Sequence, residues 1–389
     1  MKKIQYIDSF STGSFHVQIN ACLLKMLMML YPHEVAYHSS SSNKKEVVGL
    51  VPELEGDIEW NKLFVYEGKS KYAILFRYIF SAFLNIIILL RSKNNQVLVF
   101  NYNNPFSIRT VNCLNKILRR KILIVCHGEL ERLYPKEDSG FLAKLITFFV
   151  RNFFQKEKGF DSHITFCVLG ESVLHNLKDV ISPELYKHFH VIEHPYIYSY
   201  PDTLKQKIHE DGILNLGVVG SFSYAKGGRS FIQLVEEFND DTNVRFSVTG
   251  SVSYGGEELK SLGVSFPKND GKGQIPIEEF SERISQLDYI LFLYPSDSYK
   301  LTASGAIMDA IKWGKPIISI RNDYFENIFR KYGEFGFLVN DFSEMKDKIR
   351  SLIKTQMHSD YDFDSIRQNS SPESISIQMK RIVDQVLCG

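Results

Sequence analysis

The sequence of 389 residues contains little that is typical of a metal or disulfide protein. It has five cysteines, four of them in apolar runs, and none of their spacings is that of a metal site. They are Cys22, Cys113, Cys126, Cys167 and Cys388. An odd, scattered set indicates reduced thiols and a cytosolic setting. The N-terminus MKKIQYIDSF enters a strand-like run directly, without the apolar segment of a signal peptide, and favours the same expectation.

Two further absences exclude classes of function. No Gly-x-Gly-x-x-Gly follows the first predicted strand, which disfavours an NAD-type Rossmann enzyme. No signature of an RNA- or DNA-binding module is present, so nucleic acid is not expected as a partner. With 44% hydrophobic and 23% charged residues, the composition is that of an ordinary globular protein, long enough for two domains.

Charge is unevenly divided along the chain. Residues 1–200 carry 24 basic and 18 acidic side chains, and the remainder carries 22 and 27. The basic half is a candidate for contact with an anionic surface, a membrane rather than a nucleic acid. The alternative is an ordinary solvated surface with scattered charges.

Two apolar segments bear on the same question. Tyr72–Leu90 is almost long enough to span a bilayer, but Arg77 and Asn85 interrupt it, which favours a buried or membrane-surface helix. Leu145–Lys158 carries basic residues at intervals, so it either lies in a membrane interface or packs against a sheet.

Short apolar runs alternate with helix-length segments over the whole chain. The predicted strands are Ile4–Ile7, Gln96–Phe100, Ile122–Val125, His163–Leu169, Val191–Glu193, Leu214–Val219, Val244–Thr249, Tyr289–Leu293, Pro316–Ile320 and Gly336–Val339. Such alternation indicates parallel sheets covered by helices, and two sets predict an α/β protein with two doubly wound, Rossmann-like domains facing across a cleft. We expect domains at 1–200 and 201–371, and the sequence allows a C-terminal helix, 372–387, to pack back on the first.

Ligands of doubly wound sheets bind at the carboxyl ends of the strands, so the residues that follow each strand carry most information. Small or polar residues follow five of them: Ser11–Ser14, Cys126–Glu129, Gly220–Gly227, Gly250–Ser251 and Ser296–Gly305. Small residues let a backbone approach a ligand, and Lys226 supplies positive charge for a diphosphate. Each feature is weak alone, since Lys-Gly usually marks a turn; the ordered series is the signal.

The segment Tyr294–Ile318, YPSDSYKLTASGAIMDAIKWGKPII, is the most informative stretch. Thr302, Ser304 and Gly305 precede a helix, whose free N–H groups and dipole favour a phosphate. Asp309 lies one turn further on, where a carboxylate takes ribose hydroxyls. The alternative is an ordinary helix start with a solvated Asp, because Ser and Thr favour such positions.

These motifs resemble a GT-B glycosyltransferase of the nucleotide-sugar-dependent, group-1-like type that builds bacterial surface polysaccharides. The resemblance covers nearly the whole chain and is strongest in the second half. There VVGSFSYAKGG resembles the family's Lys-Gly loop, FSVTGS its next strand, and ASGAIMDAIKWGKPII the helix with the ribose-binding acid. In the first half, ILIVCHGELERL resembles the His-Gly element that faces the sugar.

The resemblance implies a role for each matching position. Lys226 would neutralise the diphosphate, and Asp309, the second acid of the family's Glu-x7-Glu element, would bind ribose. The implied nucleotide-sugar site consists of Gly13, Ser14, Gly220, Lys226, Gly227, Gly250, Gln274, Ile275, Ser296, Thr302, Ser304, Gly305 and Asp309.

The chain departs from the family at two charged positions. The first acid of Glu-x7-Glu falls at Leu301, and a frequent Arg falls at Ser221, where Arg229 or Lys300 would replace its charge. These departures leave the stereochemical outcome open and indicate a divergent branch. No Asp-x-Asp pair lies in a plausible loop, so neither a metal nor another cofactor is expected.

The catalytic prediction names His127 and Glu129. An inverting reaction needs a base, for which Glu129, His127 and Glu131 are candidates by position; in a retaining reaction the leaving phosphate takes the proton. The structural alternatives are a strand-end His127 with satisfied hydrogen bonds and a solvated Glu131.

The resemblance implies a saccharide acceptor. The basic half and the apolar segments favour a lipid-linked one, with the enzyme cytoplasmic and peripheral on the inner membrane face, where an anionic surface is a candidate partner. Two alternatives stay open: a sugar-nucleotide epimerase of the same fold, and a non-catalytic sugar- or partner-binding protein.

Overall fold

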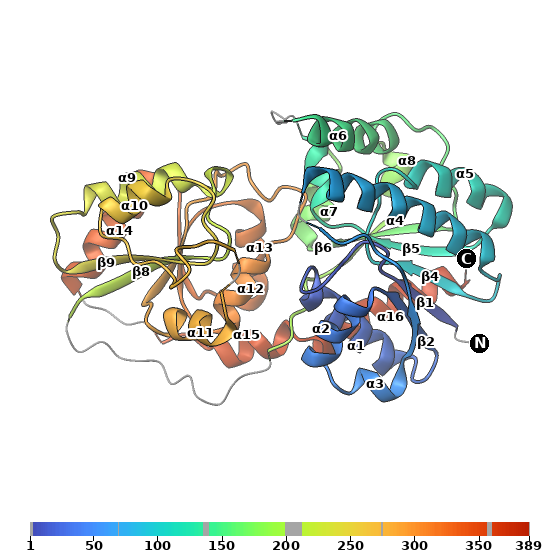
Figure 1. Cartoon of the computed structure of the whole chain (residues 1–389), viewed down its shortest axis with the longest axis horizontal. Coiled ribbons are helices and arrows are strands. Elements are labelled where there is room, and N and C mark those ends of the chain that lie inside the picture. The colour runs from blue at the N-terminus through green and yellow to red at the C-terminus, as the bar shows by residue number, and fades with distance from the viewer. Residues whose placement is uncertain are drawn as a thin grey trace. The chain divides into compact units, whose positions relative to one another are not determined.

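The computed structural model describes residues 3–68, 70–134, 140–198, 212–273, 275–355 and 360–388. The chain forms two compact units, each with its own sheet (Figure 1). Unit 1 comprises Met1–Ile197, Lys300–Ala303 and Asn369–Gly389; unit 2 comprises Tyr198–Tyr299 and Ser304–Gln368. Compared with the predicted ranges, unit 1 also contains 300–303 and 369–371, and unit 2 begins at Tyr198 instead of residue 201.

Unit 1 contains a seven-stranded parallel sheet in the order β3-β2-β1-β4-β5-β6-β7. Its strands are β1 (Ile4–Ile7), β2 (Val35–Ser39), β3 (Glu59–Lys62), β4 (Val97–Phe100), β5 (Lys121–Val125), β6 (Ile164–Leu169) and β7 (Phe189–Ile192). The sequence pattern missed β2 and β3. The edge strand β3, EWNK, is polar and largely exposed, so it lacks the apolar run of a buried parallel strand.

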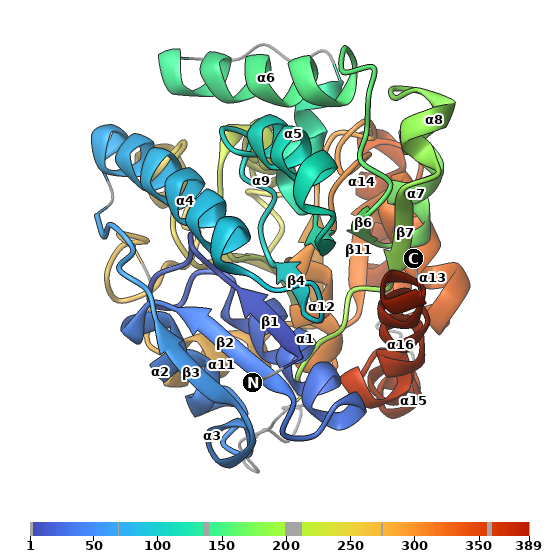
Figure 2. The ribbon, with the colours of Figure 1, turned by 90° about the vertical axis from the view of Figure 1, so that its right-hand side faces the viewer.

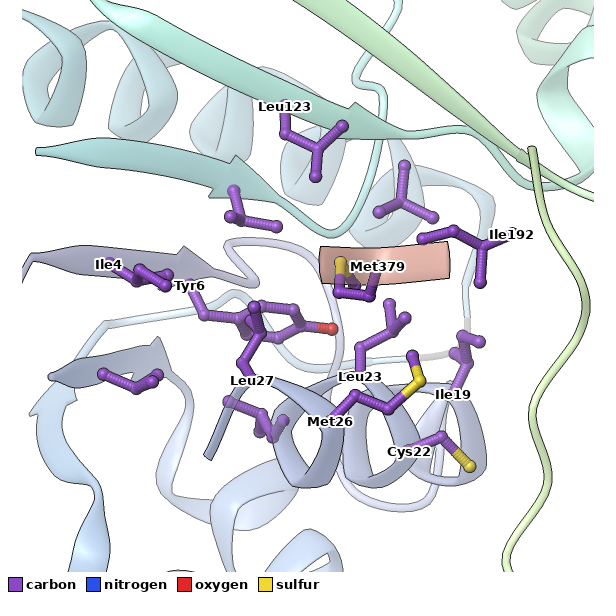
Figure 3. Close-up of a cluster of buried hydrophobic side chains, with 14 of the residues drawn as sticks. Ile4, Tyr6, Ile19, Cys22, Leu23, Met26, Leu27, Leu123, Ile192 and Met379 are labelled. Carbon is purple, nitrogen blue, oxygen red and sulfur yellow. The ribbon is translucent and has the colours of Figure 1, made fainter. Parts of the chain in front are cut away.

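The helices of unit 1 are α1 (Val17–Leu30), α2 (Ser41–Leu50), α3 (Leu54–Asp57), α4 (Lys71–Arg91), α5 (Ile108–Leu118), the 3-10 helix η1 (Gly128–Leu133), α6 (Phe141–Phe154), α7 (Glu171–Leu177), α8 (Pro183–Tyr186) and α16 (Pro372–Cys388). The last of these packs on α1, as Figure 2 shows near the C-terminus. Figure 3 shows Met379 of α16 among Ile19 and Leu23 of α1, and these side chains belong to one buried apolar cluster. Lys25 of α1 pairs with Glu373 of α16 at 2.7 Å.

Unit 2 contains a five-stranded parallel sheet in the order β12-β11-β10-β8-β9. Its strands are β8 (Leu214–Val219), β9 (Val244–Thr249), β10 (Tyr289–Phe292), β11 (Ile317–Ile320) and β12 (Gly336–Val339). Its helices are η2 (Tyr224–Lys226), α9 (Gly228–Glu237), α10 (Gly256–Ser261), α11 (Ile277–Ser285), α12 (Gly305–Lys312), α13 (Asp323–Tyr332), α14 (Phe342–Thr355) and α15 (Phe363–Asn369). The last residue of α15 and the chain that follows it belong to unit 1.

The prediction of two doubly wound α/β sheets is confirmed. In each sheet the chain reverses its direction of strand addition once, between β1 and β4 in unit 1 and between β8 and β10 in unit 2. The loops that leave neighbouring strands diverge at such a point, and ligands of open parallel sheets bind in the resulting crevice. The loops after β8 and β10, and after β1 and β4, are therefore where a site is expected.

Candidate functional site

Lys226 lies at the reversal point of the sheet in unit 2, at the end of η2 in the loop after β8. Its ammonium nitrogen is 5.9 Å from the centre of the Tyr294 ring, which follows β10. Tyr294 in turn stacks on Tyr299 with ring centres 5.0 Å apart. The two loops of the reversal point thus meet around this lysine, whose position over the ring face is that of a cation–π contact.

Asp309 supplies the nearest opposite charge. Burial lowers the pKa of Lys226, and the Asp309 carboxylate on α12 opposes that shift. The pKa of Lys312 is lowered by burial and raised by Asp309 in the same way. A partly desolvated ammonium interacts more strongly with an incoming anion than a solvated one does, because less water screens the charge.

Ser304 is the residue before α12, and its hydroxyl is not used as a helix cap. Its side chain is buried, and its Oγ has no hydrogen-bond partner among the residues that the structure describes. This hydroxyl is therefore available to a ligand oxygen at the start of the helix. Gly305, the first residue of α12, is exposed, and the start of the helix offers its backbone N–H groups beside Ser304.

Two glycines shape the strand-end loops of unit 2. Gly227 has φ +77°, and a Cβ on it would lie 1.9 Å from the carbonyl oxygen of Leu293. Gly250 has φ +150°, and a Cβ there would lie 1.9 Å from the carbonyl oxygen of Gly220. Contact between the strand-end loops therefore requires glycine at both positions. The resemblance explained Gly227 only by the approach of the diphosphate, and the structure adds this steric reason.

Four further residues of the predicted nucleotide site have other surroundings or lie outside the described residues. Ser296 is exposed in the turn after β10, and Ile275 is half-buried before α11. Gln274 lies outside the described residues. Thr302 belongs to the segment that packs with unit 1, and a Cβ on Gly128 would lie 3.5 Å from its Oγ1. The structure therefore places Ser304, Gly305, Asp309 and Lys226 in unit 2, whereas Thr302 belongs to unit 1.

Asp8 organises the reversal point of the sheet in unit 1, and sequence reasoning missed it. It directly follows β1 and is fully buried. Its Oδ1 accepts hydrogen bonds from the backbone N–H groups of Phe10 (3.0 Å) and Ser11 (2.8 Å). Its Oδ2 accepts from the Asn20 side chain at 2.6 Å and, at 3.5 Å, from that of Asn101, which follows β4. The signal was available, since Asp8 is the first polar residue after an apolar strand.

A third asparagine extends this network to the predicted loop Ser11–Ser14. Asn43, buried on α2, donates from its Nδ2 to the carbonyl oxygens of Gly13 (2.8 Å) and Phe15 (2.9 Å). Its Oδ1 accepts from Asn20 at 3.0 Å. Gly13 has φ +52° and donates its N–H to the Ser42 hydroxyl at 3.1 Å, while Ser14 is exposed. Side chains of α2 therefore hold the backbone of the loop that contains Gly13.

His127 lies where the resemblance places it, after β5. Its Nε2 is 2.6 Å from the carbonyl oxygen of Asn101, which only accepts, so Nε2 carries the proton and Nδ1 keeps its lone pair. Its ring stacks on His16, with centres 4.6 Å apart. His16 has the left-handed φ of +56°, rare for a side chain of this size. Burial lowers the pKa of both imidazoles, so both are neutral at pH 7.

Glu129 and Glu131 have different surroundings. Glu129 is buried, accepts a hydrogen bond from the backbone N–H of His127 at 2.9 Å, and has a pKa raised to about 7 by its burial. The Glu131 carboxylate instead accepts from the backbone N–H of Leu301 at 3.0 Å. Glu129 is therefore poised to take up a proton near neutral pH, while Glu131 holds the 300–303 segment.

His194 is a third histidine of this group that the sequence analysis did not select. It follows β7, so the same strand-end argument would have found it. Burial, together with the charge of His127, lowers the pKa of His194 to about 4, and its Nδ1 is enclosed without a hydrogen-bond partner among the described residues. This ring nitrogen is therefore available to a hydroxyl group at this edge of the sheet.

His194 should make the protein sensitive to acid. Above pH 6.5 it is neutral in both the folded and the unfolded protein, and between pH 6.5 and 4 only the unfolded protein binds the proton. We therefore expect His194→Asn to reduce the free energy of unfolding lost between pH 7.5 and 4.5 by about 2–3 kcal/mol, measured by urea unfolding of both proteins. The raised pKa of Glu129 acts in the opposite direction in both proteins and cancels in the comparison. The same change at exposed His175 is the control, and equal acid sensitivity of all three proteins would contradict the assignment.

Metal ligands do not cluster in the described part of the chain: no group of three or more His, Cys, Asp or Glu side chains there is placed to hold an ion. The prediction that no metal is required stays a prediction.

Comparison with known proteins identifies the fold. No protein-family model matches the chain, and no curated protein sequence matches it. Among solved structures, HepE of Anabaena, crystallised with UDP, is similar over 99% of this chain and 100% of its own, with a TM-score of 0.62 and 12% identity. The lipopolysaccharide outer core galactosyltransferase WaaB covers 99% of both chains, with a TM-score of 0.61 and 12% identity. A glycosyltransferase from Rickettsia africae covers 99% and 98%, with a TM-score of 0.57 and 14% identity. These are GT-B glycosyltransferases, so the predicted GT-B fold is confirmed.

Proposed function

We propose that this chain is a glycosyltransferase that moves a sugar from a nucleoside-diphosphate donor to a saccharide acceptor. The observation that carries the proposal lies in unit 2. Lys226 is placed at the reversal point of the sheet, with the carboxylate of Asp309 in its field, and the enclosed, unpartnered hydroxyl of Ser304 opens α12. A cation, a free hydroxyl and a helix start are the groups that bind a diphosphate, and a carboxylate one turn further on suits ribose hydroxyls.

In the proposed transfer, negative charge develops on the leaving diphosphate. The bond between the anomeric carbon and the β-phosphate oxygen breaks, and that oxygen takes the bonding electrons. Lys226 and the N–H groups at the start of α12 would stabilise the resulting charge. The acceptor hydroxyl forms the new bond to the anomeric carbon and gives up its proton.

The groups of unit 1 would take part on the side of the acceptor. Glu129, with a pKa near 7, is the group best suited to receive the acceptor proton if the anomeric carbon inverts. The neutral rings of His127 and His194 offer ring nitrogens to sugar hydroxyls without adding positive charge. In a retaining reaction the leaving phosphate would take the proton, and Glu129 would then serve only to bind the acceptor.

The structures with the same fold suggest a first donor to test. HepE has been crystallised with UDP, with UDP and glucose, and with UDP-glucose, which favours a uridine nucleotide and a hexose for this chain as well. WaaB is named as a lipopolysaccharide outer core galactosyltransferase, which supports an acceptor of the surface-polysaccharide type. A lipid-linked acceptor on the cytoplasmic side of the membrane and a reaction without metal are further parts of the proposal.

A thermal-shift screen tests the donor site. We expect one of UDP, GDP, CDP, dTDP and ADP, at about 100 times its dissociation constant, to add about 2.7 kcal/mol to the stability of unit 2. The matching nucleoside monophosphate should add much less, because it lacks the phosphate that Lys226 would hold. If no nucleoside diphosphate raised the melting temperature, the donor site would be refuted.

A second measurement separates transfer from epimerisation. A transferase releases free nucleoside diphosphate only when an acceptor receives the sugar, whereas an epimerase converts the sugar nucleotide alone. Nucleotide release that rises with the concentration of an added saccharide supports transfer. Conversion of the sugar nucleotide without any acceptor would favour the epimerase.

A further inference from the structure

Helix α4 has its apolar and polar faces reversed relative to an ordinary surface helix. Its exposed large side chains recur at helical spacing. In the preceding loop, Tyr66 packs against Phe76 with tilted rings, and Phe64 meets Phe80 edge-on. We call the resulting surface the α4 patch: Phe64, Tyr66, Tyr72, Phe76, Ile79, Phe80, Phe83 and Leu90. At 100° per residue, the six helical members fall on one side of the helix.

The opposite face of α4 is small and polar. The buried side chains of this helix are Ala73, Ser81, Ala82, Asn85 and Leu89. The hydroxyl of Ser9 donates to the side-chain amide oxygen Oδ1 of Asn85 at 2.7 Å and lies 2.7 Å from the hydroxyl of Ser81. Ordinary surface helices bury their apolar side and solvate the polar one, so a large aromatic face turned outward indicates a nonaqueous contact.

α4 is the one described helix that is long and apolar enough to cross a membrane. The contacts of its inner face favour a different arrangement. Crossing a bilayer would separate Ser81 and Asn85 from Ser9, and Arg77, which donates to the carbonyl oxygens of Tyr66 and Gly68, would enter the hydrocarbon. The helix is therefore suited to lie flat, with one face in the membrane interface.

The basic side chains of the helices near the α4 patch indicate that this patch fits an anionic surface. Helices α4, α5 and α6, which lie along one side of unit 1 in Figures 1 and 2, carry seven basic side chains and no acidic one. These are Lys71, Arg77, Arg91, Arg109, Lys116, Lys144 and Arg151. Arg109 pairs with Glu157, but Lys71, Arg91 and Lys93 are exposed at the two ends of α4. Basic groups bordering exposed aromatic residues match anionic headgroups above hydrocarbon.

We propose that the α4 patch docks unit 1 on an anionic lipid bilayer, with α4 lying in the plane of the interface. A second copy of the chain is a poorer occupant, because a symmetric contact through this face would bring two sets of basic helices together without acidic partners. The proposal goes beyond the proposed function, because it names the surface on which the enzyme works. An enzyme docked on a membrane is suited to a lipid-linked acceptor. The Ser9 bonds connect the docked helix to the residue next to Asp8, in the turn that opens the site of unit 1.

Vesicle flotation of the full chain tests the proposal, without any nucleotide or sugar. We expect the wild type to float with phosphatidylcholine vesicles containing about 30 mol % phosphatidylglycerol at about 0.05 M salt, and to bind much less at about 0.5 M salt or to phosphatidylcholine alone. The double variant F76S/F83S should lower the partition coefficient at least ten-fold. Both side chains are exposed, by 56% and 59%, so their loss should leave folding intact.

The control is Ile377→Ser on α16, an equally exposed apolar side chain of the same unit at 50% exposure, which should bind vesicles as the wild type does. Wild-type protein that stays unbound at low salt would overturn the proposal, as would equal binding by F76S/F83S. A dimer of the wild type that F76S/F83S converts to a monomer would assign the patch to a second copy. Nucleotide-induced stabilisation is measured separately, so failure here leaves the glycosyltransferase proposal standing.

Discussion

Replacing Lys226 by Met is expected to lower kcat/KM for the sugar nucleotide by about 10²–10³-fold. Met keeps the unbranched aliphatic shape of the side chain, one atom shorter, and removes its charge. The ammonium lies half-buried over Tyr294 with Asp309 as the nearest counter-charge, so in the variant the leaving diphosphate would lose its principal cation. Removing one preorganised group that stabilises developing charge typically has an effect of this size.

The split between kcat and KM carries further information. If Lys226 binds the diphosphate equally in the ground state and the transition state, KM rises and kcat is preserved. If it acts mainly on the charge that develops as the glycosidic bond breaks, kcat falls with little change in KM. We expect a fall in kcat, since the diphosphate gains charge only when it leaves.

Lys312→Met is the matched control. Lys312 lies on α12, is also partly buried, and is also influenced by Asp309, but it is in the last turn of the helix and not in the loops of the reversal point. Its loss should change kcat/KM by less than about three-fold. Equal losses in the two variants, or full activity of Lys226→Met, would remove Lys226 from the site.

The sequence was sufficient to predict most of the fold and the centre of the nucleotide site. Parallel strands buried on both faces give continuous apolar runs, so strands such as β8 and β10 were visible, and the rule that ligands lie at their carboxyl ends led directly to Lys226 and Ser304. Strands β2 and β3 were missed because the apolar part of β2, VAYHS, is limited to three residues and β3, EWNK, is a polar edge strand. Neither produces a long apolar run.

The features that sequence reasoning missed are those set by contacts between distant elements. Asp8, Asn20, Asn43 and Asn101 come from β1, α1, α2 and the end of β4, and nothing local in the sequence pairs them. Hydropathy marked the α4 segment as apolar, but not which of its faces points outward. The glycine at position 227 was predicted from phosphate binding, whereas the structure adds a carbonyl oxygen in the space that its Cβ would occupy.

Of the three histidines His16, His127 and His194, the sequence analysis selected only His127. The strand-end rule selected His127 after β5, but it applies equally to His194 after β7. His16 is different, because its left-handed backbone and its stacking on His127 depend on the loop that Asn43 holds. The role of His16 therefore becomes visible only in the three-dimensional structure, where α2 contacts that loop.

Replacing Asp8 by Ala is expected to have the largest effect on stability, a loss of about 3–5 kcal/mol in the unfolding of unit 1. Asp8 is fully buried, and its two oxygens accept four hydrogen bonds, two of them from the backbone. Alanine would leave the two backbone N–H groups enclosed without this acceptor and would remove one partner from each of the Asn20 and Asn101 amides. Each orphaned donor carries a desolvation cost of about 1–3 kcal/mol that is only partly additive. Urea unfolding measures the loss, and hydrogen exchange at the Phe10 and Ser11 amides should show reduced protection at the same time.

Two further variants make the prediction specific. Asp8→Asn preserves one acceptor oxygen for the backbone N–H groups of Phe10 and Ser11, but it sets an amide nitrogen against that of Asn20, so it should lose about half as much stability. Asp179→Ala, an exposed aspartate of the same unit, should change the stability by less than about 0.5 kcal/mol. If Asp8→Ala unfolded at the same urea concentration as Asp179→Ala, the buried network would not be what holds the turn after β1. The loop from Ser11 to His16 would then owe its conformation to contacts such as those of Ser42 and Asn43, and the stack of His16 on His127 should survive the loss of Asp8.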